Sequence, residues 1–265
     1  ICWSPELSLF VAIAYGGSNR VMTSPDGIAW TNRIASDLTS EWYSVCWSSE
    51  LSIFVAVAYS GSNRVMTSPD GITWTNRTAS DLTSAWYNVC WSPELSIFVA
   101  VSTLGDNLVM TSPDGITWTN RIASDLTSSW YNVCWSPELS IFVAVSITGA
   151  NQVMTSPDGI TWTNRIASNI SVWRSVCWSS ELSLFVAVAS SGTNRVMTSP
   201  DGITWTNRIA SDASSDWLSV CWSSELSIFV SVAFDGTDRI MTSSDGITWT
   251  SRIASDLSSS WFSIC

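Results

Sequence analysis

The 265-residue chain contains no histidine, and all 11 of its basic residues are arginine. Without histidine it lacks an imidazole base and an imidazole metal ligand, and without lysine it lacks a Schiff-base amine and a phosphate-loop lysine. Its 22 acidic residues give a net charge of −11. Because binding to nucleic acids requires clustered positive charge, we expect no nucleic-acid partner.

Long hydrophobic runs are also missing. Runs such as residues 9–15 fall far short of the ~20 apolar residues that a helix needs to cross a bilayer. No segment shows a sustained helical period of apolar residues. The hydrophobic fraction of 46% is nevertheless that of a chain with a full core. We therefore expect a folded all-β protein without membrane insertion.

The seven cysteines mark a tandem repeat of about 44 residues, and six repeats fill residues 1–265. We expect one domain, with repeats that start at Cys2, Cys46, Cys90, Cys134, Cys177 and Cys221. The even spacing differs from paired metal-binding cysteines and from the irregular framework of a small disulfide-rich protein. The chain is therefore expected to bind no metal and no cofactor, and the five cysteines other than Cys2 and Cys265 are expected to serve as small buried hydrophobes.

Each repeat contains four short β-rich runs separated by turn residues, for example 42–47, 51–58, 63–67 and 72–77. This pattern predicts a six-bladed β-propeller of four-stranded antiparallel blades, with a linear β-solenoid as the alternative. The last residues, 260–265, repeat the beginning of a first strand. We expect the N- and C-terminal segments to share a strand and close the ring. A Cys2–Cys265 disulfide at this junction is a further hypothesis.

A Ser-Pro-Asp-Gly-Ile-Thr-Trp-Thr motif occurs in every repeat with few changes, for example at residues 68–75. It resembles the Asp-box, or BNR, repeat of sialidases and related propellers, in a variant that lacks one residue between Asp and Gly. The resemblance implies a structural hairpin at the periphery of each blade. It assigns a turn-stabilising role to Asp26, Asp70, Asp114, Asp158, Asp201 and Asp245. One carboxylate per turn is too few to bind calcium.

The resemblance also raises the possibility of a sialidase-like glycoside hydrolase. Such enzymes use an asymmetric site that draws different residues from different blades, whereas nearly every polar residue here is copied six times. No pair of carboxylates is singled out for glycoside hydrolysis. We therefore expect no enzymatic activity and keep the hydrolase as a remote alternative.

The repeats differ most between their second and third strands and where one repeat enters the next. We expect these two sets of loops to lie on one face of the propeller. Aromatic, acidic and arginine side chains there suit the apolar faces and hydroxyls of sugars. The candidate aromatic platforms are Trp42, Trp86, Trp130, Trp173, Trp217 and Trp261. The candidate polar partners are Asp37, Asp81, Asp125, Asn169, Asp212, Asp256, Arg20, Arg64, Arg195 and Arg239.

Six weak sites on one scaffold would give avidity without a strong single site. The first functional hypothesis is therefore a multivalent, lectin-like protein whose partners are glycans. The alternative is a structural or protein-interaction scaffold, including a unit of a larger array, whose partner is a protein surface. An acidic, lysine-free chain rich in Ser, Thr and Trp favours an extracellular or cell-surface location.

Overall fold

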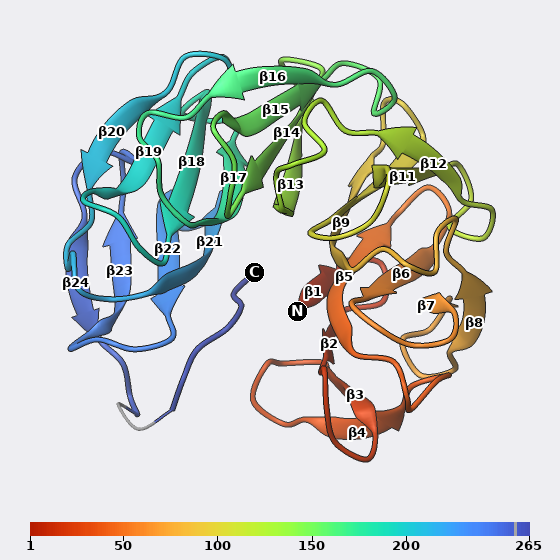
Figure 1. Cartoon of the computed structure of the whole chain (residues 1–265). Coiled ribbons are helices and arrows are strands. Elements are labelled where there is room, and N and C mark those ends of the chain that lie inside the picture. The colour runs from red at the N-terminus through yellow and green to blue at the C-terminus, as the bar shows by residue number, and fades with distance from the viewer. Residues whose placement is uncertain (257–258) are drawn as a thin grey trace. The chain divides into compact units, whose positions relative to one another are not determined.

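A computed structural model describes residues 1–256 and 259–265. Within these ranges the chain is all β, with 24 strands in six four-stranded antiparallel sheets (Figure 1). Each sheet contains four strands that are consecutive in the sequence. This is the composition expected of a six-bladed propeller. It excludes a linear solenoid, whose strands would form continuous sheets along the chain.

The chain contains two compact units of three sheets each. The expectation that the six repeats form one domain stays a prediction. The first unit comprises residues 1–126 and 158–161, and the second comprises residues 127–157 and 162–265. The strands of the first unit are β1 (Cys2–Ser4), β2 (Leu9–Ile13), β3 (Arg20–Ser24), β4 (Thr31–Ile34), β5 (Trp42–Ser48), β6 (Ile53–Ala58), β7 (Arg64–Ser68), β8 (Thr75–Thr78), β9 (Trp86–Ser92), β10 (Ile97–Ser102), β11 (Leu108–Ser112) and β12 (Thr119–Ile122).

The second unit repeats this arrangement. Its strands are β13 (Trp130–Ser136), β14 (Ile141–Ser146), β15 (Gln152–Ser156), β16 (Thr163–Ile166), β17 (Trp173–Ser179), β18 (Leu184–Ala189), β19 (Arg195–Ser199), β20 (Thr206–Ile209), β21 (Trp217–Ser223), β22 (Ile228–Ala233), β23 (Arg239–Ser243) and β24 (Thr250–Ile253).

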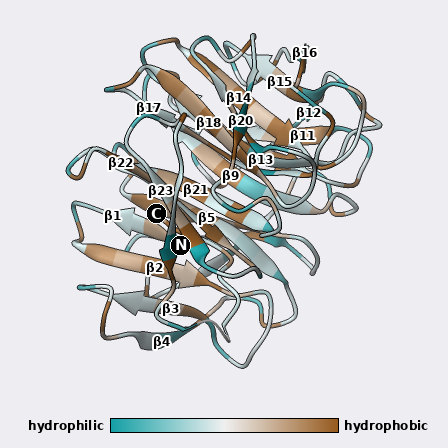
Figure 2. Ribbon diagram, turned by 90° about the vertical axis from the view of Figure 1, so that its left-hand side faces the viewer, coloured by the Kyte–Doolittle hydropathy of each residue, from teal (hydrophilic) through white to brown (hydrophobic). Residues whose placement is uncertain are grey.

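In the middle sheet of each unit, the second strand is apolar on both sides because each side faces another sheet of that unit. In β6, residues 54–57 are fully buried. Figure 2 shows the same hydrophobic character along β18. Val55, on one side, joins the cluster that packs against β9 and β10, whereas Phe54 joins the cluster that packs against β2. This two-sided burial explains why the strands lack the polar alternation of a half-exposed sheet.

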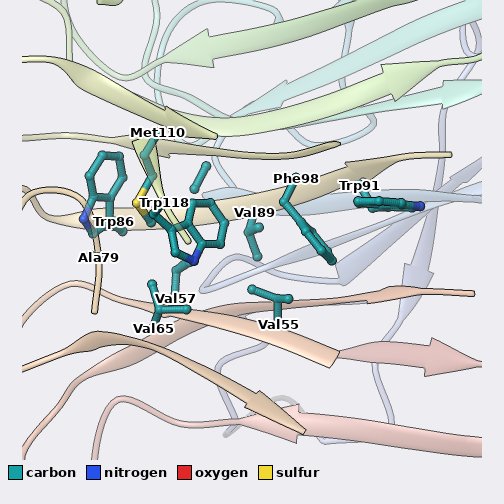
Figure 3. Close-up of a cluster of buried hydrophobic side chains, with 11 residues drawn as sticks. Val55, Val57, Val65, Ala79, Trp86, Val89, Trp91, Phe98, Met110 and Trp118 are labelled. Carbon is teal, nitrogen blue, oxygen red and sulfur yellow. The ribbon is translucent and has the colours of Figure 1, made fainter. Parts of the chain in front are cut away.

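One such cluster lies between the second and third sheets of the first unit (Figure 3). Val55, Val57 and Val65 come from the second sheet, and Phe98 and Met110 come from the third. All five side chains are fully buried. At roughly 25 cal/mol per Å² of buried apolar surface, such clusters are the main source of the stability of a sheet stack.

Four cysteine side chains, those of Cys2, Cys46, Cys134 and Cys177, pack at the edges of such clusters. Cys46 packs against the cluster shown in Figure 3. Burial raises the pKa of the Cys46 thiol well above its usual range, and its neighbours Cys2 and Cys90 raise it further. Cys2 lies in β1 opposite Val11 and packs against the core of the first two sheets. A disulfide between Cys2 and Cys265 would join the two units, and it stays a prediction.

The two chain ends belong to different units, and the sharing of one strand between them stays a prediction. Residues 259–265 contain no strand, and β1 forms the edge of the first sheet with only three residues. Ile264 N donates a hydrogen bond of 3.3 Å to Ser219 Oγ in β21. Val220 N makes the equivalent bond of 3.2 Å to Ser175 Oγ in the preceding sheet. The C-terminal segment therefore lies against β21 where the first strand of a further sheet would lie, but without pairing into a sheet.

Candidate functional site

The tryptophans proposed as exposed sugar platforms are core residues. Trp42, Trp86, Trp130, Trp173 and Trp217 are each at most 1% exposed, which corrects the expectation that they stack on ligands. Trp86 lies among Val57, Val65 and Ala79 of the preceding sheet (Figure 3), and its indole Nε1 donates to the backbone oxygen of Asp81 at 3.1 Å. Trp261, in the strandless C-terminal segment, is the one member of this set that is partly exposed.

The aspartates proposed as sugar ligands bind the backbone and hydroxyls of their own turns. Asp81 Oδ1 accepts hydrogen bonds from Thr83 N at 2.7 Å and from Thr83 Oγ1 at 2.6 Å, and Asp81 Oδ2 accepts from Ser84 Oγ at 2.8 Å. Asp37 and Asp212 make the same three bonds, and Asp256 accepts one from Ser259. The carboxylate oxygens of these aspartates therefore stabilise an Asx-type turn instead of binding a ligand.

The turn that contains Asn169 is one residue shorter, and there the buried Asn169 Oδ1 has no hydrogen-bond partner. Asp125 lies at the same repeat position as Asp81 and also interacts with neighbouring groups. The acidic and amide side chains of this set therefore do not converge on one ligand position.

The four arginines of the proposed sites are also structural. Arg20, Arg64, Arg195 and Arg239 each begin the third strand of a sheet with a φ near +60°, a left-handed conformation that is uncommon outside glycine. In Arg64, Nε donates to Gly61 O at 3.3 Å, and Nη1 donates to Ser84 O. The guanidinium thereby joins the loop of its own sheet to the turn that precedes the next sheet.

Each Asp-box-like motif stabilises its own hairpin. Asp70 Oδ1 accepts hydrogen bonds from the backbone N atoms of Ile72 at 2.8 Å and Thr73 at 2.7 Å. The indole Nε1 of Trp74 donates to Gly71 O at 3.1 Å. Asp26, Asp114, Asp158, Asp201 and Asp245 make the same two backbone contacts.

A cluster of four tyrosines occupies the variable loop and strand-entry positions of the first unit. This tyrosine cluster consists of Tyr15, Tyr43, Tyr59 and Tyr87. The ring centroid of Tyr43 lies 6.2 Å from that of Tyr15, 5.9 Å from that of Tyr59 and 4.6 Å from that of Tyr87. Tyr59 and Tyr87 are 5.5 Å apart. Four of the five tyrosines of the chain thus form one continuous aromatic surface.

The tyrosine cluster is accessible because of a local irregularity in the first strand. The pairing of β5 with β6 shifts between Trp42 and Ser44, so that Tyr43 has no opposite residue. A bulge of this kind redirects a side chain away from the regular alternation of the strand. Tyr43 is 39% exposed and Tyr15 is 59% exposed. Tyr59 and Tyr87 are partly buried beside them.

Apart from Tyr131, the corresponding positions in the second unit carry side chains other than tyrosine. Arg174 occupies the position of Tyr43 in its own repeat, and its guanidinium carbon lies 4.7 Å from the ring centroid of Tyr131. Arg174 Nε also donates to Ser190 Oγ at 3.0 Å. Phe234 and Phe262 form an edge-to-face pair at 5.5 Å. The repeats therefore share a scaffold but present different chemistry at these positions.

The signal that distinguishes these residues was present in the sequence. Trp42 and its counterparts recur in every repeat, as expected of packing residues. The next position changes from Tyr43, Tyr87 and Tyr131 to Arg174, Leu218 and Phe262. Selecting the aromatic residue that varies, rather than the one that recurs, would have identified the tyrosine cluster.

The described parts of the chain contain neither a candidate metal site nor a candidate membrane-spanning helix. Among residues 1–256 and 259–265, no group of three or more acidic, histidine or cysteine side chains is placed to hold a metal ion. The same ranges contain no helix that is long and apolar enough to cross a membrane.

The sequence matches no known protein family and no curated protein. Solved structures resemble it in fold at low identity. A streptogramin B lyase structure gives a TM-score of 0.83 at 9% identity, covering 98% of this chain and 84% of the lyase. Virginiamycin B lyase from Staphylococcus aureus gives 0.72 at 10% identity, covering 84% and 73% of the two chains. A chain of a nidogen/laminin complex gives 0.68 at 9% identity, covering 96% of both.

The chain is a six-bladed β-propeller. Its resemblance to both lyases and a component of a protein complex shows only the fold, because one propeller architecture carries many unrelated functions. The function of this propeller must therefore be argued from its own side chains, above all those of the tyrosine cluster.

Proposed function

We propose that this propeller is a non-enzymatic interaction scaffold that binds a protein partner through the tyrosine cluster. The observation that carries the proposal is the contiguity of Tyr15, Tyr43, Tyr59 and Tyr87 on otherwise structural loops. Tyrosine is enriched where proteins bind other proteins because it offers a large, rigid contact area and a polar hydroxyl at small entropic cost.

The proposal favours the scaffold over the six-site lectin. A lectin of that kind needs an accessible aromatic platform and available polar groups in each repeat. Five of the six tryptophans are buried, and the aspartates and arginines around them are bonded to the backbone of neighbouring turns. The four clustered tyrosines lie in one unit, and the exposed aromatic residues of the other unit are the separate Phe234–Phe262 pair. This uneven distribution suits one partner better than six equivalent sugars.

The hydrolase alternative has little support in the side chains. The six repeated Asp-box carboxylates are held by turn amides, as in Asp70. Glu50 accepts a hydrogen bond from the indole of Trp91 in the next sheet. A retaining or inverting glycosidase needs two carboxyl groups that face one substrate, and these two repeated sets are engaged in stabilising turns and joining sheets.

Selection from a displayed random-peptide library against the full chain tests this proposal. We expect peptides that bind the wild-type protein and lose binding to Tyr43→Ser. Tyr131→Ser is the matched control, because Tyr131 holds the same repeat position but is covered by Arg174. Failure to select any peptide, or equal binding to Tyr43→Ser and wild type, would overturn the proposal. A glycan array run in parallel would favour the lectin if a glycan bound and depended on Tyr43.

A further inference from the structure

The second unit shows which group packs on a tyrosine that follows the buried tryptophan of a first strand. The guanidinium of Arg174 lies 4.7 Å from the ring centroid of Tyr131, within the distance of a cation–π interaction. Arg174 is also oriented by its bond to Ser190 Oγ. The chain therefore contains an internal example of arginine held on a tyrosine that follows the buried tryptophan of its strand.

The same position in the first unit has the aromatic rings but no corresponding arginine. Arg174 is contributed by the repeat that follows Tyr131. The repeat that follows Tyr43 contributes Tyr87 instead, at 4.6 Å. The rings of the cluster are inclined to one another by 31° to 76°, so that they do not stack as parallel plates. Inclined rings can present more than one π-face to a single cation.

The two nearby arginines of the first unit are committed elsewhere. Arg64 interacts electrostatically with Asp81 and with Tyr59, but its guanidinium donates to Ser84 O and Gly61 O. Arg20 donates to Ser40 O and Gly17 O in the same way. Burial lowers the pKa of Arg64, as expected for a cation held among backbone groups.

The charge of the protein favours a cation as the incoming group. The net charge is −11, and the chain contains no lysine. Glu41 precedes Trp42 at the edge of the cluster, and its backbone oxygen accepts a hydrogen bond from Tyr59 N at 2.8 Å. A net negative charge raises the concentration of a basic partner near the protein and disfavours an acidic one.

We infer that the tyrosine cluster binds an arginine side chain from a basic segment of the partner protein, an inference that rests on the proposed function. Arginine is preferred to lysine because its planar guanidinium stacks on aromatic rings and is less strongly hydrated. The partner's arginine would occupy in the first unit the role that Arg174 has in the second.

Fluorescence anisotropy with three labelled peptides of one Gly/Ser framework tests this inference. One peptide carries arginine at two positions, the second lysine and the third citrulline, which keeps the shape of arginine without its charge. We expect the arginine peptide to bind wild type roughly tenfold more tightly than the citrulline peptide. We expect a similar loss with Tyr43→Ser and no loss with Tyr131→Ser.

Two features keep the test interpretable. Tyr43→Ser leaves the net charge at −11, so that the nonspecific attraction of basic peptides to the protein is unchanged. A thermal unfolding curve of the Tyr43→Ser variant verifies that this variant folds. Equal affinity of the arginine and citrulline peptides for wild type would overturn the inference. If, with these equal affinities, the peptides selected from the library still required Tyr43 for binding, the arginine inference would be overturned and the proposed function would stay in place. If neither the selected peptides nor the basic peptides required Tyr43, the proposed function and the arginine inference would both be overturned.

Discussion

The indole of Trp91 and the carboxylate of Glu50 join two neighbouring sheets: Trp91 Nε1 donates a hydrogen bond of 2.7 Å to Glu50 Oε2. The same bond joins Trp47 to Glu6, Trp178 to Glu138 and Trp222 to Glu181. Two residues that recur throughout the sequence thus act as a pair across successive repeats. Their recurrence reflects assembly of the sheets rather than a repeated ligand site.

Glu50→Ala is expected to lower the free energy of unfolding by about 1 kcal/mol, the usual contribution of a hydrogen bond to a charged group at a partly exposed position. Urea denaturation measures the effect. Glu41→Ala is the matched control, because the Glu41 carboxylate forms no hydrogen bond to another sheet within the part of the chain that the structure describes. Equal losses in the two variants would show that the Glu50–Trp91 bond does not stabilise the stack.

Ser251→Asn is expected to stabilise the protein. Ser168 Oγ donates to Asn207 Oδ1 at 2.7 Å, and this bond links the outer parts of two adjacent sheets. At the next junction asparagine is replaced by Ser251, and the buried Ser211 Oγ has no partner. An asparagine would supply the missing acceptor and raise the free energy of unfolding by about 1 kcal/mol. Asn207→Ser should produce the opposite change, and a neutral result for both would contradict this account of the junction.

Gly61→Ala should destabilise the first unit by about 2 kcal/mol or more. Gly61 has a φ of +122°, and an added Cβ would lie 2.7 Å from Ser40 Cα. Both the backbone conformation and the close approach require glycine. Gly16→Ala provides the control, since a Cβ there meets nothing within 4 Å. Thermal unfolding should separate the two variants clearly, and similar melting temperatures would show that the loop can move aside.

Stability should fall in acid as the turn aspartates are protonated. Hydrogen bonds from the side chain and backbone of Ser214, followed by that from Ser215, lower the pKa of Asp212 from 3.8 to about 2. A lowered pKa in the folded state stabilises the fold above pH 3.8, and this contribution disappears as the pH falls towards 2. We expect Asp212→Asn to cost about 1 kcal/mol at pH 6 after allowance for solvent screening. The difference from wild type should vanish near pH 2, and a constant difference would contradict the assignment.

The fold was largely predictable because the same strand-forming and turn-forming residues recur in all six repeats. The expected strands 42–47 and 51–58 agree closely with β5 and β6, and the Ser-Pro-Asp-Gly turn marks the hairpin before each outer strand. The unequal chain ends were harder to predict. Ile1–Cys2 and Ile264–Cys265 match the same repeat position, and sequence similarity cannot decide which end pairs into a sheet.

The candidate site was less predictable because exposure depends on the neighbouring sheet. The adjacent residues Trp86 and Tyr87 do not show by themselves which side chain is buried. In the structure Val57 and Val65 cover the indole of Trp86, whereas the phenol of Tyr87 joins the tyrosine cluster. Likewise, no glycine or proline beside Tyr43 predicts the bulge in its strand. Both features arise from packing between repeats rather than from local propensity.

The central claim is that the recurring tryptophans form the core and the variable tyrosines form the binding surface. Hydroxyl-radical footprinting with mass spectrometry tests this claim most directly. We predict rapid modification of Tyr15 and Tyr43 in the native protein and strong protection of Trp86, with protection lost on unfolding. Modification of native Trp86 at a rate matching that of Tyr15 would contradict the account.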